Sequence, residues 1–156
     1  MGNVKVGSSS ALVDDEDFEK VSQFNWFLTT AGYAIKNNPR NKQKRTRTFM
    51  HRFILDAPKD KEVDHINRNP LDNRKSNLRL CSRSENIINT SRKSNRSGFK
   101  GVTKDSKNTW TVRIWLEGKS VHVGCYKNKI SAAKVYDELA KTYHGRFAAL
   151  NFPEYQ

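Results

Sequence analysis

The last third of the chain has the pattern of a small antiparallel sheet covered by one helix. Apolar residues occupy every second position of 110–116, which predicts a strand with one apolar face. Segments 99–102 and 121–126 predict two further strands, separated from it by turn-forming residues. Asn128 is a typical helix N-cap. Small and aromatic residues then recur at helical spacing, which predicts a helix over the apolar face of the sheet: Ala132, Ala133, Tyr136, Ala140 and Tyr143.

The middle of the chain predicts a strand, a polar loop, a second strand and a helix. Val63 to Ile66 reads as the end of a short strand, and a loop rich in asparagine and other turn formers follows it. Residues 78–81 alternate apolar with basic residues, as expected for a half-buried return strand. Ser82 to Glu85 fits a capping box, so a helix begins there with Asn86 in its first turn.

The first 60 residues have a less regular pattern. Residues 7–10 are glycine and serine and predict a loop. The acidic run after Val13 predicts a short helix, followed by an aromatic plug. Segments 32–36 and 47–51 predict a strand pair joined by the basic loop 37–45. Its basic residues leave two roles equally open, a solvated loop or a clamp on a DNA backbone: Arg40, Lys42, Lys44 and Arg45.

Composition and charge narrow the class of partner. The net charge of +13 on 156 residues predicts a polyanionic partner, and no long apolar run or lipidation signal supports a membrane. The hydrophobic content of 35% predicts small cores. Cys81 and Cys125 are too few and too far apart for a zinc site, and their apolar strand patterns predict buried free thiols. The start of the chain lacks the apolar core of a signal peptide, so we expect an intracellular protein that is not secreted.

The middle segment also carries a pattern suited to phosphodiester hydrolysis. Asp64 offers a carboxylate and Asn86 an amide oxygen, both hard ligands for Mg²⁺ or a similar divalent ion. Successive strand residues point to opposite faces, so His65 would stand apart from the ion as a base toward water. A metal at the leaving oxygen and a base at the water together describe a phosphodiester hydrolase.

This stretch resembles the HNH endonucleases of the phage and intron homing type. The matching residues are Asp64-His65, Asn77 and Asn86. The resemblance implies a ββα-metal finger in which Asp64 and Asn86 hold Mg²⁺ or Mn²⁺ and His65 is the general base. Asn77 would brace the loop and so orient the imidazole. Many relatives have histidine at the third position, whereas Asn86 is a weaker ligand. The resemblance also suggests phosphate contacts at Asn73, Arg74, Arg79 and His51, although for His51 a packed or surface side chain is favoured.

The C-terminal sheet would leave an uncovered face with Arg113 and Trp115. Lys100, Thr103 and His122 are their expected neighbours, and such a face can enter a DNA major groove. Trp115 has the alternative of a domain contact. Residues 98–153 resemble the apetala-two family of ethylene-response-factor domains, through Gly101-Val102, the Trp110 strand, the helix with Tyr136-Asp137, and the closing Leu150-Asn151-Phe152-Pro153. The family carries more arginines on its sheet, so its base preference does not transfer. Residues 89–97 predict a basic linker along DNA, with Arg92, Lys93 and Arg96.

The predicted fold is α+β, with an HNH module at 1–88 (finger core about 61–89), a linker at 89–97 and an apetala-two-like domain at 98–156. We expect a site-directed homing endonuclease that uses one divalent metal, binds double-stranded DNA and acts as a monomer on it. One finger per chain suggests nicking of one strand, and a dimer could break both. Two alternatives are a non-cleaving DNA-binding regulator that keeps the HNH fold, and an RNA-binding protein.

Overall fold

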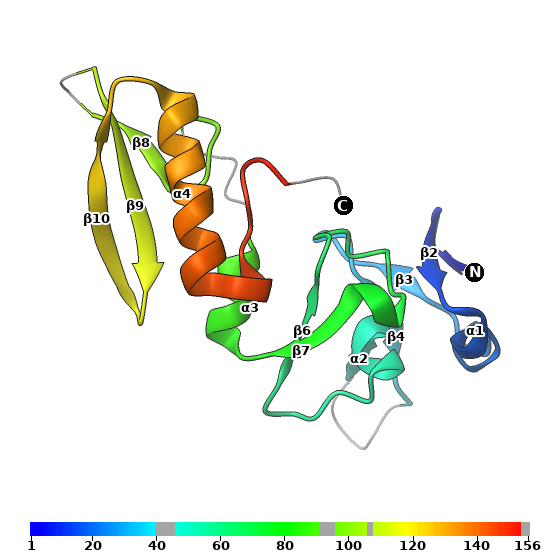
Figure 1. The fold of residues 1–156 in the computed structure, drawn as a ribbon. Helices are drawn as coiled ribbons and strands as arrows, with labels where there is room; N and C mark the ends of the chain where they lie inside the picture. Colours follow the sequence, from blue (N-terminus) through cyan, green and yellow to red (C-terminus); the bar gives the residue numbers. More distant parts are fainter. Residues whose placement is uncertain (40–45, 91–95, 106–107, 154–156) are drawn as a thin grey trace. The chain divides into compact units, whose positions relative to one another are not determined.

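The computed structural model describes residues 1–39, 46–90, 96–105 and 108–153 (Figure 1). The chain is a mixed α/β protein that divides into two compact units, Met1–Asn86 and Ile87–Gln156. In the part of the chain described, no helix is long and apolar enough to cross a membrane. The predicted module boundaries at residues 88 and 97 stay predictions.

The N-terminal unit begins with a hairpin that the sequence did not predict. β1 (Gly2–Val6) pairs antiparallel with β2 (Ser9–Val13), and only two residues form the turn. Ser9 and Ser10 are therefore strand residues, and their assignment to a loop was wrong. The turn needs Gly7, whose φ of +58° lies in the left-handed region. The strands' apolar residues point inward in alternation, so the hairpin packs on the unit's core.

The rest of this first segment forms a small sheet between two helices. The acidic run after the hairpin starts α1 (Asp15–Ser22), as predicted. β3 (Phe27–Leu28), β4 (Ala34–Asn37) and β5 (Arg47–Phe49) form an antiparallel sheet in that order. α2 (Met50–Ile54) follows directly. The predicted strand pair is confirmed, except that Met50 and His51 belong to the helix. Buried apolar residues from these elements form one core: Val4, Val6, Val13, Val21, Trp26, Met50 and Ile54.

The middle of the chain has the predicted order of strand, loop, strand and helix. β6 (Glu62–His65) pairs antiparallel with β7 (Leu78–Cys81), and the loop between them ends in a short 3-10 helix, η1 (Lys75–Asn77). α3 (Arg83–Asn89) follows. The capping box is formed: Glu85 N donates to Ser82 Oγ at 3.3 Å, and Ser82 N donates to Glu85 Oε2 at 2.7 Å.

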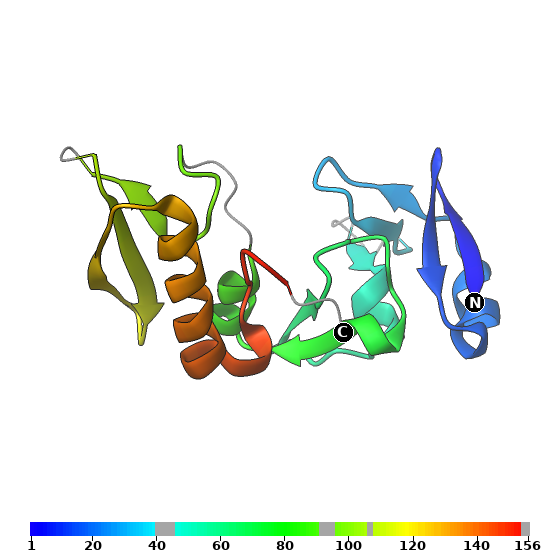
Figure 2. The same cartoon turned by 45° about the horizontal axis from the view of Figure 1, so that its top comes forward.

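The C-terminal unit is a three-stranded antiparallel sheet covered on one face by α4 (Lys129–His144) (Figure 2). β9 (Trp110–Leu116) is central, with β8 (Val102–Lys104) and β10 (Lys119–Tyr126) beside it. A short 3-10 helix, η2 (Gly145–Phe147), follows α4. The Asn128 side chain caps α4, as predicted, by accepting from the backbone N–H of Ile130 at 2.7 Å and of Ser131 at 3.2 Å.

Two details of this sheet differ from the prediction. The first strand begins at Val102, because Gly101 has a φ of +71° and forms a turn with the residues before it. Cys125 is exposed, whereas Cys81 is a buried free thiol as expected. A β-bulge between His122 and Gly124 shifts the alternation by one residue, so Cys125 moves to the outer face, opposite Thr111.

A buried carboxylate holds the segment after η2 on α4. Asp137 on α4 accepts the backbone N–H of Asn151 and of Phe152, each at 2.8 Å. Asn151 in turn accepts from the Lys100 backbone N–H at 2.6 Å. The Tyr136-Asp137 and Leu150 to Pro153 motifs are therefore parts of one clamp, which joins the helix to the turn before β8.

Candidate active site

Asp64 and His65 end β6 and have different neighbours, as expected for successive strand residues. Asp64 lies opposite Arg79 in the register, and Arg79 donates to Asp64 Oδ2 from Nε at 2.8 Å and from Nη2 at 2.5 Å. His65 instead lies 3.3 Å from the side chain of Asn73, measured from Nε2 to Oδ1. Both Asp64 and His65 are buried. The strand thus separates a carboxylate from an imidazole by one backbone step.

Oxygen donors gather on the Asp64 side of β6. Glu62 is two residues before Asp64, so both point to the same face. Asn86 on α3 donates from Nδ2 to Glu62 Oε2 at 2.6 Å, which leaves its amide oxygen as the group to offer a cation. Burial, together with the smaller effects of the nearby carboxylates of Asp64, Glu62 and Glu85, raises the pKa of the Cys81 thiol to about 11. Glu62 is a site residue that the sequence interpretation missed, although its spacing from Asp64 was a usable signal.

This donor set fits a hard divalent cation. Carboxylate and amide oxygens suit Mg²⁺, which often takes only one or two protein ligands and completes its shell with water and phosphate. Within the ranges described, no group of three His, Cys, Asp or Glu side chains forms a metal cluster of its own. Asp64 with Asn86 is a smaller set of one acid and one amide. Arg79 supplies the positive charge beside Asp64 in this structure.

His65 belongs to a group of aromatic rings that the sequence did not predict, in which the two histidines are buried and the other rings half-buried. The rings of His65 and His51 meet edge to face, with centroids 5.0 Å apart and planes at 86°. Tyr33 contacts both rings, and Phe49 stacks on His51. Burial lowers the pKa of His65, while the Asn73 contact and the charges of Asp64 and Asp72 partly offset this. Burial, together with the smaller effects of the His65 and Arg52 charges, lowers the pKa of His51 to about 3.

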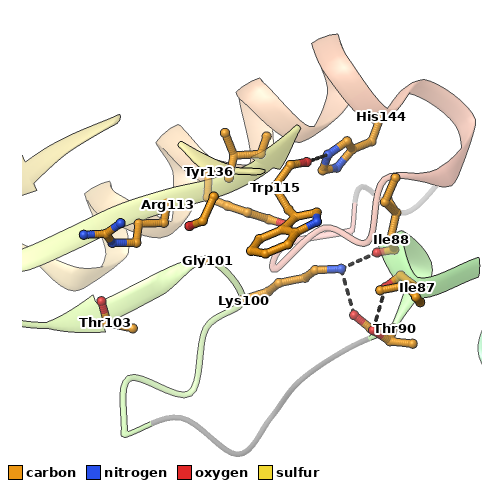
Figure 3. A pocket seen from close by; sticks show the side chains of 12 residues that line it. Ile87, Ile88, Thr90, Lys100, Gly101, Thr103, Arg113, Trp115, Tyr136 and His144 are labelled. Carbon is orange, nitrogen blue, oxygen red and sulfur yellow. Dashed lines mark hydrogen bonds between the residues drawn. The ribbon is translucent and has the colours of Figure 1, made fainter. Parts of the chain in front are cut away.

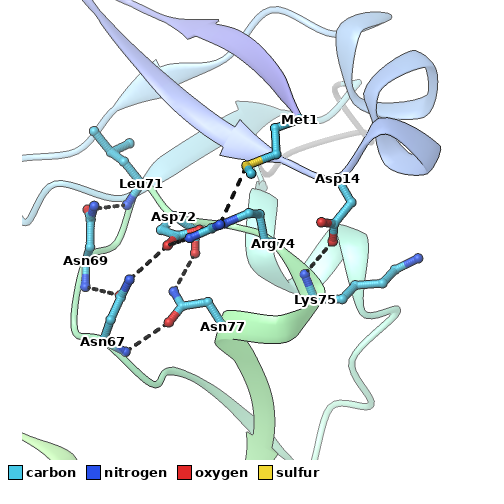
Figure 4. A network of polar contacts seen from close by, with 9 residues as sticks. All are labelled: Met1, Asp14, Asn67, Asn69, Leu71, Asp72, Arg74, Lys75 and Asn77. Atoms are coloured by element: carbon cyan, nitrogen blue, oxygen red, sulfur yellow. Dashed lines mark hydrogen bonds and ion pairs between the residues drawn. The ribbon is translucent and has the colours of Figure 1, made fainter. Parts of the chain in front are cut away.

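Asn77 braces the loop that carries Asn73 (Figure 4). Its side chain donates to the backbone oxygen of Asp72 at 2.7 Å and accepts from the backbone N–H of Asn67 at 2.9 Å. Asp72 is buried and accepts from Arg74 at 2.7 and 2.6 Å, and these hydrogen bonds lower the pKa of its carboxyl. The bonds give the loop a fixed shape, and Asn73 next to Asp72 is thereby held against His65.

The predicted phosphate contacts have other partners in this structure. Arg74 pairs with Asp72 and Arg79 with Asp64. Asn73 and His51 are buried, Asn73 against His65 and His51 within the aromatic group. The roles assigned to these four residues, and to His65, Asn77, Asp64 and Asn86, stay predictions.

The predicted DNA-contact residues lie mainly on the outer face of the C-terminal sheet. Arg113 is opposite His122 in the register, and Thr103 is opposite Thr111, so these side chains share a face with Trp115. Four of the predicted contact residues are exposed: Thr103, Arg113, Trp115 and His122.

The other predicted DNA contacts lie before the sheet. Lys100 donates from Nζ to the backbone oxygens of Ile88 and Thr90, so it caps the end of α3. Arg96 is exposed in a turn. Arg92 and Lys93 of the linker, and the basic residues of 40–45, lie outside the described residues.

Comparisons with known proteins support the resemblance to HNH endonucleases. The family model for HNH endonucleases matches residues 56–87. An uncharacterized HNH endonuclease of Acanthamoeba polyphaga mimivirus is 32% identical over 143 residues, covering 90% of this chain and 74% of the relative. The chain belongs to the HNH endonuclease family. Protein 3.8 of Escherichia phage T7 is 34% identical over 93 residues, 58% of this HNH endonuclease and 76% of the phage protein.

The C-terminal resemblance is also confirmed. An AP2/ERF and B3 domain-containing protein of Oryza sativa subsp. japonica is 37% identical over 57 residues, 36% of this HNH endonuclease and 16% of the plant protein. The chain therefore combines an HNH nuclease part with an AP2-like part. No solved structure matches it at a significant level.

Proposed function

We propose that this HNH endonuclease is a site-directed DNA endonuclease of the homing type. It hydrolyses phosphodiester bonds with one divalent metal ion and His65 as general base, and its C-terminal sheet binds duplex DNA. The observation that carries the proposal is the setting of His65. The imidazole is buried beside a carboxylate-bearing strand position and is held by Asn73 in a loop that Asn77 braces. An imidazole held in this way supports a role as the base that takes a proton from the attacking water.

The environment of His65 favours its neutral, basic form. Burial lowers the pKa of His65, so the ring has a lone pair at neutral pH. The amide oxygen of Asn73 can only accept, so the contact places the ring proton on Nε2 and the lone pair on Nδ1. Nδ1 takes a proton from water as the water oxygen bonds to phosphorus. One P–O ester bond then breaks, and the leaving oxygen is protonated from solvent.

Asp64 and Asn86 would hold the ion, with Glu62 beside them on the same face. When bound, a divalent cation stabilises the negative charge that develops on the leaving oxygen. In this structure Arg79 pairs with Asp64. Since a guanidinium also binds phosphate with two hydrogen bonds, a DNA phosphate is a second partner for Arg79. Mg²⁺ is the cation that this set of oxygens suits best.

The C-terminal sheet would determine which DNA sequence the enzyme binds. Its outer face exposes Arg113, Trp115 and His122, and residues 98–156 carry ten Lys and Arg against five Asp and Glu. Binding of this unit to DNA raises the effective concentration of the finger near its target, so the finger itself needs little affinity. A single chain with one finger would act as a monomer and nick one strand. The expected location inside the host cell fits a DNA substrate and stays a prediction.

Nicking of supercoiled DNA tests the proposal. A supercoiled plasmid library with random inserts would be incubated with the chain and Mg²⁺ at low salt. We expect conversion to the nicked form by the wild type, loss of at least about 100-fold in rate for His65→Ala, and nearly unchanged DNA binding by that variant. Asp64→Ala and Asn86→Ala should in addition raise the Mg²⁺ concentration required. Full activity of His65→Ala would remove the imidazole from the mechanism.

A second candidate function is a non-cleaving DNA-binding regulator that keeps the finger as a fold. The specific observation in its favour is the two-bond pairing of Arg79 with Asp64, which already balances the charge of the proposed ligand. Tight binding of duplex DNA without nicking, under conditions in which Mg²⁺ and Mn²⁺ are both tried, would favour the regulator. Preferential binding of structured RNA over duplex DNA would instead favour an RNA-binding protein.

A further inference from the structure

The C-terminal unit contains a pocket that is partly lined by the proposed DNA-binding face (Figure 3). Its volume is about 620 Å³, within the usual range for sites that hold small molecules or single groups. Strands β8, β9 and β10 supply one wall, with Thr103, Arg113, Trp115 and Ser120. The last residues of α3 and the residue after it supply another, with Ile87, Ile88 and Thr90. We call this the Trp115 pocket.

Two large apolar side chains of the pocket are only half covered by the protein. Trp115 is 57% exposed and Ile87 is 51% exposed. In Figure 3 the Trp115 side chain points from β9 toward Lys100 and the end of α3. The strand is fixed at this point, because His144 Nε2 donates to the Trp115 backbone oxygen at 2.9 Å. A flat apolar group inserted here would cover the exposed tryptophan ring on a strand that is already held, so the backbone at Trp115 would need no further ordering.

The polar groups of the pocket suit a base attached to a phosphate. Arg113 shares the outer face with Trp115 and stands two residues before it, roughly 7 Å away along the strand. Among the described residues, His144 Nδ1 is buried without a hydrogen-bond partner. Since His144 Nε2 donates its proton to the Trp115 backbone oxygen, Nδ1 keeps its lone pair, but the protein covers this atom, so Arg113 is the group that reaches a ligand. The Lys100 ammonium lines the pocket too, but it caps α3.

The shape of the pocket favours an unpaired base over the edge of a base pair. In a duplex both faces of each base are stacked, so only an unstacked base can offer its face to Trp115. The end of α3 stands over this part of the sheet, whereas Arg113 and His122, paired in register, remain exposed to solvent. The excess of basic residues in this unit favours a base that belongs to a nucleic acid over a free aromatic molecule.

We propose that the Trp115 pocket accepts one unpaired nucleobase of bound DNA, stacked on Trp115, with its phosphate at Arg113. The substrate class is then a duplex with an extruded or unpaired nucleotide next to the segment that lies on the sheet. The inference rests on the proposed function for DNA as the polymer, but the pocket does not depend on cleavage.

Binding of matched hairpin DNAs tests the pocket. Three hairpins of one sequence would be compared in EDTA: fully paired, with a one-nucleotide bulge, and with the same bulge lacking its base. We expect the full-length chain to bind the bulged hairpin about 10-fold more tightly than the abasic one, the order expected for one stacked base. Tryptophan fluorescence should be quenched only by the bulge that has a base.

Four variants separate stacking from general effects. Trp115→Ala should abolish the 10-fold preference, and Trp115→Phe should keep most of it. Ser120→Phe, which fills the pocket from the position opposite Trp115 and leaves Trp115 and Arg113 in place, should also abolish it. Tyr143→Ala is the matched control, because Tyr143 is 60% exposed but lies outside the pocket lining. Tyr143→Ala should bind as the wild type does.

The outcomes distinguish this proposal from the proposed function. A preference that persists in Trp115→Ala and Ser120→Phe, or that is absent in the wild type, would overturn the pocket assignment even if the plasmid is nicked. A preference that depends on Trp115 would support it even if no nicking occurs. Tighter binding of a bulged RNA hairpin than of the DNA hairpin would overturn the assignment to DNA.

Discussion

His51 and His65 are the residues at which burial and proton binding conflict most strongly. Each side chain is buried among aromatic rings, and burial lowers the pKa of both. A charged imidazole loses much more hydration free energy than a neutral one on entering such a site. The arrangement therefore keeps His65 available as a base near neutral pH, and it makes the folded state sensitive to acid.

The pKa of His51 predicts the direction and the range of that sensitivity. Its folded value of about 3 lies below the unfolded value, so the unfolded chain binds the proton more tightly. The stabilising effect is fully present above about pH 6.5 and is lost as pH falls from there toward 3. Between pH 7 and pH 5 the free energy of unfolding should fall by about 2 kcal/mol from this group alone. His65 acts in the same direction.

Denaturant unfolding at several pH values measures this effect. With Trp110 and Trp115 replaced by phenylalanine, the buried Trp26 reports on the N-terminal unit. In that background, His51→Leu should have a smaller dependence of the unfolding free energy on pH than His51 itself. Equal slopes for the two proteins would show that His51 takes up its proton without unfolding, contrary to the expectation from its burial.

Gly101 is a residue at which conformation and space both require glycine. Its φ is +71°, and an added Cβ would lie 2.0 Å from the Tyr136 ring and 2.8 Å from the Arg113 backbone oxygen. Gly118 also has a positive φ, of +76°, but nothing lies within 4 Å of an added Cβ. Gly101→Ala should therefore lower the free energy of unfolding by about 2–5 kcal/mol, and Gly118→Ala by only about 1 kcal/mol. Thermal unfolding followed by circular dichroism compares the two, and similar losses would mean that Tyr136 moves aside easily.

At the scale of elements, the short helix α3 begins at the capping box and also carries Asn86, a proposed metal ligand. The helix has only seven residues, so it depends on its cap and on packing more than a longer helix would. Asn86 is the fourth residue of this helix, and its backbone N–H donates to the Ser82 backbone oxygen at 3.0 Å. Loosening of the capping box should therefore loosen the position of the Asn86 side chain.

Substitution of the two helix caps tests this link. Ser82→Ala should destabilise the fold by about 1 kcal/mol and raise the Mg²⁺ concentration for half-maximal nicking about twofold to fivefold, and Ser82→Thr should restore both. Asn128→Ala is the matched control, because it removes a similar cap from α4 in the other unit. It should lower stability by a similar amount and leave the Mg²⁺ dependence unchanged. A change in Mg²⁺ dependence in both variants would point to general destabilisation.

Elements whose signals are local were predictable, and those set by long-range partners were not. The caps at Ser82 and Asn128 and the alternation in β9 depend on neighbours within a few residues, and the structure has all three. Ser9 and Ser10 looked like a loop because only pairing with β1 makes them a strand. Cys125 was predicted to be buried, but the bulge between His122 and Gly124 shifts the alternation by one residue and turns Cys125 to the exposed face.

The candidate site likewise has some residues that local sequence predicts and some contacts that it does not. Asp64, His65 and Asn86 could be proposed from type and spacing, since a strand and a capped helix fix their directions. The contact of His65 with His51 and Tyr33 joins residues far apart in sequence, so no local pattern could reveal it. Lys100 was expected on the DNA face, whereas its ammonium donates to backbone carbonyl groups at the end of α3, a contact that no local pattern indicates.

At the scale of the whole molecule, positive charge is concentrated past residue 60. Residues 1–60 carry ten Lys and Arg against seven Asp and Glu, whereas residues 61–97 carry nine against four and 98–156 ten against five. Several acidic groups of the first segment are also paired, as Glu16 and Asp17 are with Lys75. Attraction to DNA should therefore come mostly from the segments that carry the finger and the sheet, and it should weaken as salt is added.

The salt dependence of binding can assign part of that attraction to one side chain. For duplex DNA, each phosphate neutralised contributes about −0.9 to the slope of log affinity against log salt concentration. If Arg113 contacts a phosphate, Arg113→Ala should make the slope less negative by roughly 0.9, besides lowering the affinity at any one salt concentration. Lys134→Ala removes a charge from the exposed side of α4, which covers the opposite face of the sheet, and it should leave the slope nearly unchanged. Equal effects of the two substitutions would mean that the net charge of the unit, and not its outer sheet face, determines how it holds DNA.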